Sequence, residues 1–185
     1  MKKNKDFILS QVLKRDWARM LAYCDLESKN LSFANLFNPR FFCVVLIRLS
    51  YGLQNSGYTR LSKFVSLINY VLNGIEYPAT LEIGPGLVIP HSQGIVLGAG
   101  YIGENVTIYH QVTLGAKLID CHFNKALRPT IEDDVVITVG AKIIGPVTIG
   151  RGTFVGANSV VLTDVPQHSL AVGVPAVIKP LVDRV

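Results

Sequence analysis

The sequence has few charged residues and few cysteines. Charged residues make up 17% of the 185 positions, and hydrophobic residues make up 49%. Ordinary globular chains are about 25% charged, so this composition excludes an intrinsically disordered chain and predicts a large core or assembly with further copies. Cys24, Cys43 and Cys121 are scattered and form no CxxC pair. We therefore expect neither disulfides nor structural zinc, and we infer a reducing compartment.

Export, membrane-spanning and nucleic-acid-binding signals are weak as well. The apolar stretch near the N-terminus is too short for a secretory signal. The run from Phe41 to Leu53 is interrupted by Arg48 and falls short of the roughly 18 apolar residues of a membrane span. No dense Lys/Arg block or nucleic-acid module is present, so we expect no nucleic-acid partner. A cytoplasmic protein is the expectation, with peripheral attachment at the inner face of a membrane kept open.

The positive charge is concentrated in the first part of the chain. Residues 1–74 contain eleven Lys and Arg against four Asp and Glu, whereas residues 75–185 contain seven against nine. A basic segment can meet anionic lipid or an anionic substrate. It can equally be a solvated helical face, and the sequence leaves both interpretations open.

Residues 1–74 are predicted to form an α-helical region. Apolar residues recur at spacings of three and four, which is typical of amphipathic helices, and Asn38-Pro39 is a typical helix start. Asn55-Ser56-Gly57 is a turn signal. We expect three apolar faces on these helices, made of Leu13, Trp17, Met20, Leu21 and Cys24, then Phe42, Val45, Leu46, Leu49 and Leu53, then Leu61, Phe64, Val65, Ile68 and Leu72.

From residue 75 the period changes to six. The recurring aliphatic residues are Ile83, Ile89, Ile95, Ile102, Ile108, Leu114, Ile131, Ile137, Ile143, Ile149, Val155 and Val161. Glycine often follows the aliphatic residue, and small or β-branched residues fill the fifth position. A helix cannot keep an interval of six over several steps, so the repeat predicts a β-solenoid in which each hexad supplies one short strand and one corner. We expect this solenoid over 75–185, with a loop insertion at 116–129.

The hexads match the [Leu/Ile/Val]-Gly-x-x-small-x pattern of the hexapeptide-repeat acyltransferases. The segments VTIYHQVTLGA and SVVLTDVPQHSLAVGVPAVIKP resemble serine O-acetyltransferases and O-acetyltransferases of surface polysaccharides, and NPRFFCVVLIRLSYGL resembles their helix before the repeats. The resemblance implies a mainly β fold, a left-handed parallel β-helix of hexapeptide repeats with an N-terminal α-helical region. It also implies a homotrimer with active sites between subunits and acetyl-CoA as the acyl donor.

His91 is the candidate general base. The motif IPHSQGIVLG resembles the stretch that carries the catalytic histidine in serine acetyltransferases. Acyl transfer to an alcohol requires the hydroxyl to lose its proton during attack, and an imidazole titrates in the range suited to that task. By the same resemblance, Glu76 stands where those enzymes carry the aspartate beside the histidine, and Gly115 in VTLGA is a candidate oxyanion donor through its N–H. Each of the three can also be an ordinary structural residue of the coil.

His110 occupies the same position of its hexad as His91, so the two should stack in adjacent coils. One interpretation places His110 in the acceptor pocket. A second interpretation makes both histidines metal ligands, as in carbonic anhydrases built on the same solenoid, with His122 or Cys121 completing the set. The next position of the stack is Val139, which cannot bind a metal, and no tight ligand spacing supports a site. We therefore expect no metal.

The resemblance also implies residues that bind coenzyme A. Gly140, Ala141 and Ala157 match positions where small residues and backbone groups contact the pantetheine arm. Lys179 in the tail could reach a phosphate. Packing alone also explains each of these four residues.

The acceptor is the least constrained part of the prediction. Serine acetyltransferases carry an aspartate directly before the catalytic histidine and an Arg-His pair before the final proline of the loop. Here Pro90 and Leu127-Arg128 stand at these places, and Arg128 is the candidate substrate-binding residue of the loop. Because these polar contacts set discrimination, we expect a sugar hydroxyl of a bacterial surface polysaccharide or its precursor. Free serine, an amino sugar and a non-catalytic trimeric scaffold are the alternatives.

Overall fold

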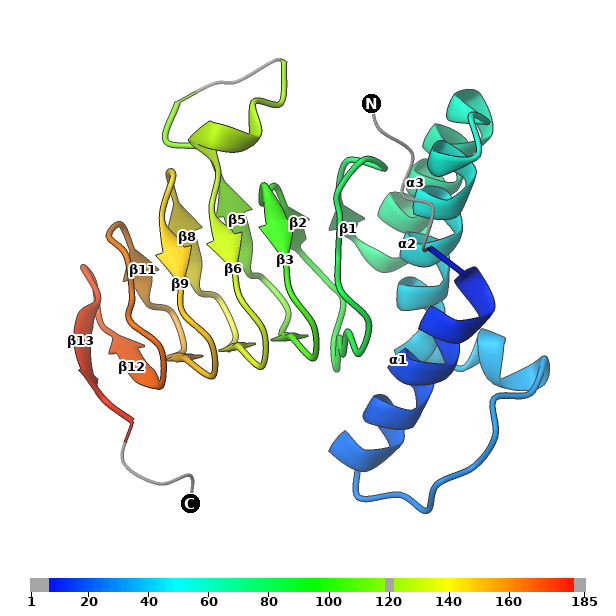
Figure 1. The fold of residues 1–185 in the computed structure, drawn as a ribbon, viewed down its shortest axis with the longest axis horizontal. Coiled ribbons are helices and arrows are strands. Elements are labelled where there is room, and N and C mark those ends of the chain that lie inside the picture. The colour runs from blue at the N-terminus through cyan, green and yellow to red at the C-terminus, as the bar shows by residue number, and fades with distance from the viewer. Residues whose placement is uncertain (1–6, 119–121, 182–185) are drawn as a thin grey trace.

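The structure is a computed structural model that describes residues 7–118 and 122–181. Helices at the N-terminal end pack against the first coil of a three-sided solenoid, which runs away from them to the C-terminus (Figure 1). The helical segments are α1 (Leu9–Tyr23), η1 (Ala34–Phe37), α2 (Pro39–Asn55), α3 (Thr59–Asn73) and, in the loop that leaves the solenoid, η2 (Lys125–Leu127).

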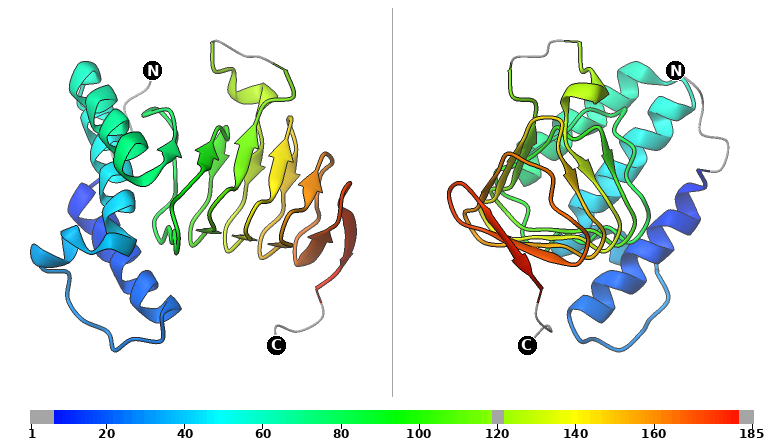
Figure 2. Two further views of the ribbon diagram at one scale, coloured as in Figure 1. Left: turned by 180° about the vertical axis from the view of Figure 1, so that it is seen from behind. Right: turned by 60° about the vertical axis from the view of Figure 1, so that its left-hand side comes forward.

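The strands are short and stack in three parallel sheets (Figure 2). One sheet has the order β1-β2-β5-β8-β11, the second has the order β4-β7-β10-β12-β13, and the third has the order β3-β6-β9. Only the last pair, β12 with β13, is antiparallel. The strands are β1 (Ile75–Glu76), β2 (Ile95–Leu97), β3 (Tyr101–Ile102), β4 (Thr107–Ile108), β5 (Thr113–Gly115), β6 (Thr130–Ile131), β7 (Val136–Ile137), β8 (Lys142–Ile144), β9 (Thr148–Ile149), β10 (Phe154–Val155), β11 (Val160–Val161), β12 (Ser169–Val172) and β13 (Val177–Pro180).

The hexad aliphatics form the interior of the solenoid. Ile102 pairs with Ile131, Ile131 pairs with Ile149, and Leu114 pairs with Ile143 in the next coil. Their side chains are fully buried. A single coil would expose its inward aliphatic side chains to water above and below. Stacking of successive coils buries this apolar surface. The six-residue period is confirmed as the spacing of the strands.

The corner that carries His91 departs from this period. Val88 pairs with Thr107 and Val96 pairs with Thr113. Eight residue steps therefore separate Val88 from Val96, but only six separate their partners. As a consequence Leu97, rather than Ile95, stacks on Leu114. The sequence periodicity placed Ile95 opposite Leu114. The two extra residues fall inside one corner and leave Ile95 and Leu97 both buried, so the aliphatic pattern does not show the shift.

A buried ion pair fastens the helices to the first coil. Arg48 of α2 donates through Nε to Oδ2 of Asp16 of α1 at 2.8 Å, and both side chains are almost fully buried. The Asp16 carboxylate also accepts from the backbone N–H groups of Gly86 and Leu87. Arg48 donates in addition to the carbonyl of Gly84 at 2.7 Å. Every charge is matched, which is the condition under which burying such a pair is tolerated.

The start of α2 is confirmed: Asn38 is the N-cap, its Oδ1 accepts from the Arg40 N–H, and Pro39 holds the first helical position. The predicted apolar face of α2 is confirmed for Leu46 and wrong for its other members. Phe42, Val45, Leu49 and Leu53 are only partly buried, whereas α2 buries Phe41, Cys43, Val44, Leu46, Ile47, Arg48 and Ser50. Arg48 is among the buried residues because it pairs with Asp16, a contact that a hydrophobic pattern does not reveal.

The predicted face of α3 is confirmed for Val65 and wrong for Leu61, Phe64 and Leu72. The helix buries Ser62, Val65 and Asn69, while Leu61, Phe64 and Leu72 are exposed. The apolar face of α1 is confirmed for Leu13, Trp17, Met20 and Leu21. These α1 residues, parts of α2 and the solenoid interior form one continuous core. No helix within the described ranges is long and apolar enough to cross a membrane.

Candidate active site

His91 and His110 lie together at the corner between the β4 and β5 sheets. Their ring centroids are 5.5 Å apart and the rings meet edge to face, at 88°. The predicted stacking in adjacent coils is therefore confirmed. Gly140 donates its N–H to the His110 carbonyl, so the third coil continues this corner without a third histidine. The neighbour at that level is Val139.

The two histidines share a pocket with the N-terminal turn of α2. Its volume is about 550 Å³, and its lining is Pro39, Arg40, Cys43, Ile89, Pro90, His91, Ser92, Gln93 and His110. The Arg40 side chain brings a positive charge into this pocket, and its Nη1 lies 3.9 Å from the Cys24 sulfur. No carboxylate lines the pocket. The site is thus an imidazole pair beside a guanidinium, at the positive end of a helix.

His110 carries a buried ring nitrogen whose bonding capacity is unused. Its Nδ1 is inaccessible to solvent and has no hydrogen-bond partner among the described residues. A buried polar atom left in this state costs about 1–3 kcal/mol. A rotation of the imidazole ring, or a polar ligand group that hydrogen-bonds to Nδ1, would remove that cost. This fits a role for His110 in lining the pocket. The His91 side chain, by contrast, is exposed.

A second hollow adjoins the first on the side of α1. It is lined by Met20, Tyr23, Cys24, Arg40, Val88, Ile89, Pro90, His91 and Tyr109. The Tyr23 and Tyr109 hydroxyls are hydrogen-bonded to each other. Partial burial, followed by this hydrogen bond, raises the pKa of Tyr23 to about 12, so the Tyr23 phenol stays protonated at neutral pH as a donor or acceptor. Sequence reasoning missed Arg40, Tyr23 and Tyr109, because no spacing rule predicts which helical residues face His91.

Glu76 and Gly115 lie away from His91 within the chain. Both line a different pocket, together with Arg128. Glu76 is exposed on β1, where it pairs with Val96, and the described residues show no hydrogen bond or ion pair between it and His91. Gly115 ends β5 and pairs with Ile144. Their roles as orienting carboxylate and oxyanion donor therefore stay predictions. These roles require the pocket with Glu76 and Gly115 of one copy to face the His91 pocket of another copy.

Arg128 is held by its own loop. Its guanidinium lies 3.8 Å from the centroid of the Phe123 ring, and Nη1 donates to the carbonyl of Gly98 at 3.1 Å. These contacts fix the last turn of the loop insertion against the corner between β2 and β3. The assignment of Arg128 to substrate stays a prediction, and it concerns the pocket with Glu76 rather than the pocket with His91.

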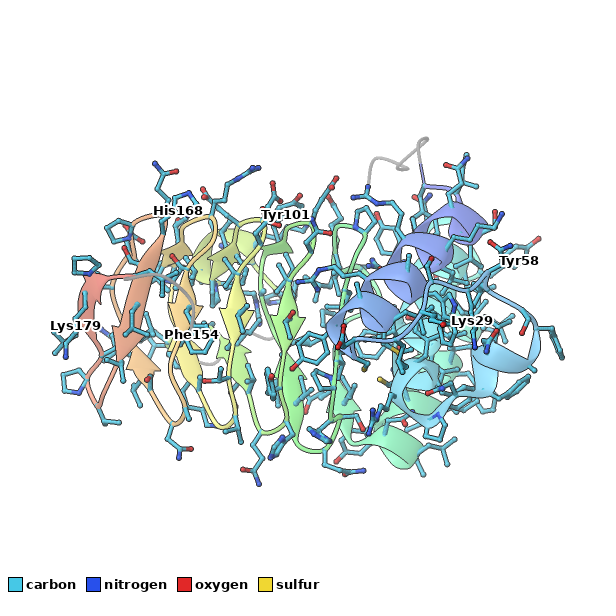
Figure 3. All side chains as sticks on the ribbon, turned by 90° about the horizontal axis from the view of Figure 1, so that it is seen from below. Lys29, Tyr58, Tyr101, Phe154, His168 and Lys179 are labelled. Atoms are coloured by element: carbon cyan, nitrogen blue, oxygen red, sulfur yellow. The ribbon has the colours of Figure 1, made fainter. Side chains whose placement is uncertain are left out.

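The residues assigned to coenzyme A lie on the last coils. Gly140 turns a corner at a φ of +71°, where an added Cβ would come within 2.1 Å of Asn158. Ala157 is exposed, whereas the Ala141 methyl group is fully buried, so any contact of Ala141 with pantetheine has to come from its backbone. Lys179 is exposed on β13 at the end of the solenoid (Figure 3). The assignments of these four residues to coenzyme A stay predictions.

The described residues contain no group of three His, Cys, Asp or Glu side chains placed to hold a metal ion. His122 lines a separate pocket together with Lys125 and Glu82, and neither His91 nor His110 lines that pocket. Cys121 lies outside the described residues.

A three-sided coil of hexads with an imidazole-lined pocket defines a hexapeptide-repeat transferase. The family model of the bacterial transferase hexapeptide, with six repeats, matches residues 128–163. A serine acetyltransferase of Helicobacter pylori strain J99 is 37% identical over 153 residues, which cover 82% of this chain and 88% of the relative. A serine acetyltransferase of Bacillus pumilus is 42% identical over 117 residues, 62% of this chain, and the chain spans about half (52%) of that relative.

Solved structures agree with the sequence comparisons. The serine acetyltransferase of Neisseria gonorrhoeae superposes with a TM-score of 0.81 at 28% identity, covering 95% of this chain and 67% of that one. A serine acetyltransferase in complex with CoA superposes with a TM-score of 0.78 at 28% identity, covering 92% and 69%. The chain belongs to the hexapeptide-repeat acyltransferase family. It is an O-acetyltransferase that uses acetyl-CoA as its donor.

Proposed function

We propose that the chain acetylates the hydroxyl group of serine, with His91 as the general base. The observation that carries the proposal is the similarity to a serine acetyltransferase over most of both chains, with His91 and His110 gathered in one pocket. The sequence alone favoured a sugar acceptor. The relatives compared above support serine instead.

The chemistry needs one base and one leaving-group acid. As the serine oxygen attacks the thioester carbonyl, the His91 imidazole takes its proton. When the tetrahedral intermediate collapses, the carbon–sulfur bond breaks and the imidazolium returns the proton to the departing thiolate. The products are O-acetylserine and free coenzyme A. The exposed His91 ring reaches both partners from the rim of the pocket.

Recognition of serine requires a partner for its carboxylate. Arg40 lines the pocket beside His91, and among the described residues its guanidinium has only a weak contact to the Cys24 sulfur. A guanidinium binds a carboxylate through two parallel N–H donors. Arg40 therefore takes the role that the loop arginine of the serine enzymes was expected to hold, while Arg128 stays bound to Phe123 and Gly98.

The site is completed between subunits of a homotrimer of left-handed coils. Within one chain, Glu76 and Gly115 line a pocket separate from that of His91. If neighbouring copies pack corner to sheet, the His91 pocket of one copy can face the Glu76 pocket of the next. Sedimentation equilibrium at several concentrations tests this assembly. A monomeric mass in an active sample contradicts it.

A sugar hydroxyl is the second candidate acceptor. One specific observation favours it: no carboxylate lines the His91 pocket to pair with the serine ammonium group, and Pro90 stands directly before His91. A neutral sugar makes no such demand. The protein would then act in the cytoplasm, on a precursor of a surface polysaccharide.

Mass spectrometry of the acetylated product decides between the two acceptors. The purified protein is incubated with acetyl-CoA and an equimolar mixture of serine and candidate sugars. Acetylserine as the dominant product supports the proposal. An acetylated sugar with unmodified serine overturns it and selects the second candidate.

A further inference from the structure

Helix α3 presents its polar side inward and its apolar side outward. The side chains that it buries are Ser62, Val65 and Asn69. Ser62 donates from its hydroxyl to the Ser50 carbonyl at 2.7 Å, and the Asn69 amide donates to the Cys43 carbonyl at 3.0 Å. These small and polar groups let α3 pack closely on α2. Most of the large apolar side chains of α3 therefore stay exposed in the described part of the chain.

The outward side chains form a continuous apolar stripe, which we call the α3 face. Its members are half exposed or more: Leu61 (50%), Phe64 (58%), Leu67 (55%), Val71 (69%) and Leu72 (59%). Leu61, Phe64, Leu67 and Val71 recur at three- and four-residue spacing along one side of the helix, and Leu72 follows at its C-terminal end. Scattered apolar residues are normal on a protein surface, whereas a contiguous stripe of this kind marks an interaction site.

The charge around the α3 face is of one sign. Arg60 and Lys63 are exposed on the same helix, and the sequence contains no Asp or Glu between Pro39 and Gly74. The exposed Tyr58 and Tyr70 lie near the two ends of the helix. An apolar stripe with flanking cations and aromatic residues is the composition of helices that lie in the interface of an anionic membrane.

The position of α3 leaves this face accessible. The helix lies at the helical end of the molecule, beyond the first coil (Figures 1 and 2). Tyr58, directly before α3, lies at the end opposite Lys179 (Figure 3). The long axis of the solenoid therefore extends away from any flat surface that contacts this end.

We propose that the α3 face docks on the surface of an anionic phospholipid membrane. Two copies pairing through this face would bury the stripe but leave Arg60 and Lys63 without a counter-charge, because the same patch faces itself and α2 and α3 contain no Asp or Glu. Anionic lipid headgroups instead neutralise both cations while the apolar stripe enters the headgroup boundary. The docking is independent of whether serine or a sugar is the acceptor.

Vesicle co-sedimentation of the full-length protein tests the proposal. The probes are phosphatidylcholine vesicles with and without phosphatidylglycerol, each at low and at high salt. We expect binding only to the anionic vesicles, and weaker binding at high salt. The double variant Phe64→Ser/Val71→Ser should lose at least tenfold in affinity. The variant Lys63→Ser should lose about fivefold, which corresponds to one cation near the surface.

The controls separate this result from misfolding and from self-association. Val177→Ser removes an equally exposed apolar side chain (58%) at the far end of the solenoid and should bind vesicles as the wild type does. Circular dichroism verifies that the double variant keeps its helices. No binding to anionic vesicles at low salt overturns the proposal. So does a double variant that binds normally, or one whose oligomeric mass differs from that of the wild type, because the face then joins copies of the chain.

Discussion

Removing one partner of the Asp16–Arg48 ion pair should strongly destabilise the protein. In Asp16→Asn the side chain keeps its shape and one acceptor oxygen for the Gly86 and Leu87 amides. It loses the negative charge opposite a guanidinium that is only 2% exposed. Because the Arg48 charge then stays buried without a counter-charge, we expect a loss of about 3–5 kcal/mol in unfolding free energy.

The reverse change leaves the opposite charge unpaired. Arg48→Met removes the donors to the Asp16 carboxylate and to the Gly84 carbonyl, while the carboxylate stays buried on two backbone amides. We expect a similar loss of about 3–5 kcal/mol. The double variant Asp16→Asn/Arg48→Met contains no buried charge at this site, so its loss should be smaller than the sum of the single losses by at least about 2 kcal/mol.

Urea denaturation followed by circular dichroism measures all three variants at one protein concentration. Arg15→Met is the matched control, because its ion pair with Glu104 is half exposed and should contribute less than about 1 kcal/mol. The reasoning is refuted if Asp16→Asn costs no more than this control, or if the two single losses simply add in the double variant.

Three further predictions concern stability and substrate binding. Burial raises the pKa of Cys43 to about 12. The contribution of the thiol to stability is therefore complete below the unfolded pKa near 9 and falls above it by about 1.4 kcal/mol per pH unit. The urea midpoints at pH 8 and pH 10 should differ less in Cys43→Ala than in the wild type, and an equal difference in both proteins contradicts this. Gly86→Ala places a methyl group 2.3 Å from an asparagine oxygen of the next coil at a φ of +86°, whereas Gly57→Ala at +93° meets nothing within 4 Å; thermal unfolding should show a larger loss for Gly86→Ala, of about 1–3 kcal/mol. Arg40→Ala should raise the KM for serine about tenfold, the cost of one charged hydrogen bond, while Arg60→Ala leaves it unchanged; equal KM values for the two variants argue against carboxylate binding by Arg40.

The solenoid could be predicted because its information is local and repeated. An aliphatic residue at every sixth position stacks on the same residue one coil later, so spacing alone gave the inward positions and the meeting of His91 with His110. The extra residues in the His91 corner could not be located this way. A corner can absorb two residues while Ile95 and Leu97 both remain buried, so the aliphatic pattern does not record the shift.

The helical region was less predictable because its packing depends on partners distant in sequence. In the sequence Arg48 interrupts an apolar run. In the structure its side chain is buried and pairs with Asp16, which lies 32 positions earlier. The same helix, α2, carries Cys43 and Arg40, which line the histidine pocket. Hydrophobic periodicity records which residues are apolar. It does not record which face packs against the rest of the protein, and the apolar face of α3 is exposed among residues 7–118 and 122–181.

The rate of thiol release from acetyl-CoA by the wild type and by His91→Ala tests the central claim most directly. The assay is run with saturating acceptor, and His168→Ala, an exposed histidine at the far end of the solenoid, is the matched control. Loss of a general base predicts a fall in kcat of about 10²–10⁴-fold for His91→Ala, with full activity for His168→Ala. Unchanged kcat in His91→Ala, with intact secondary structure, contradicts the claim that His91 takes the proton of the acceptor.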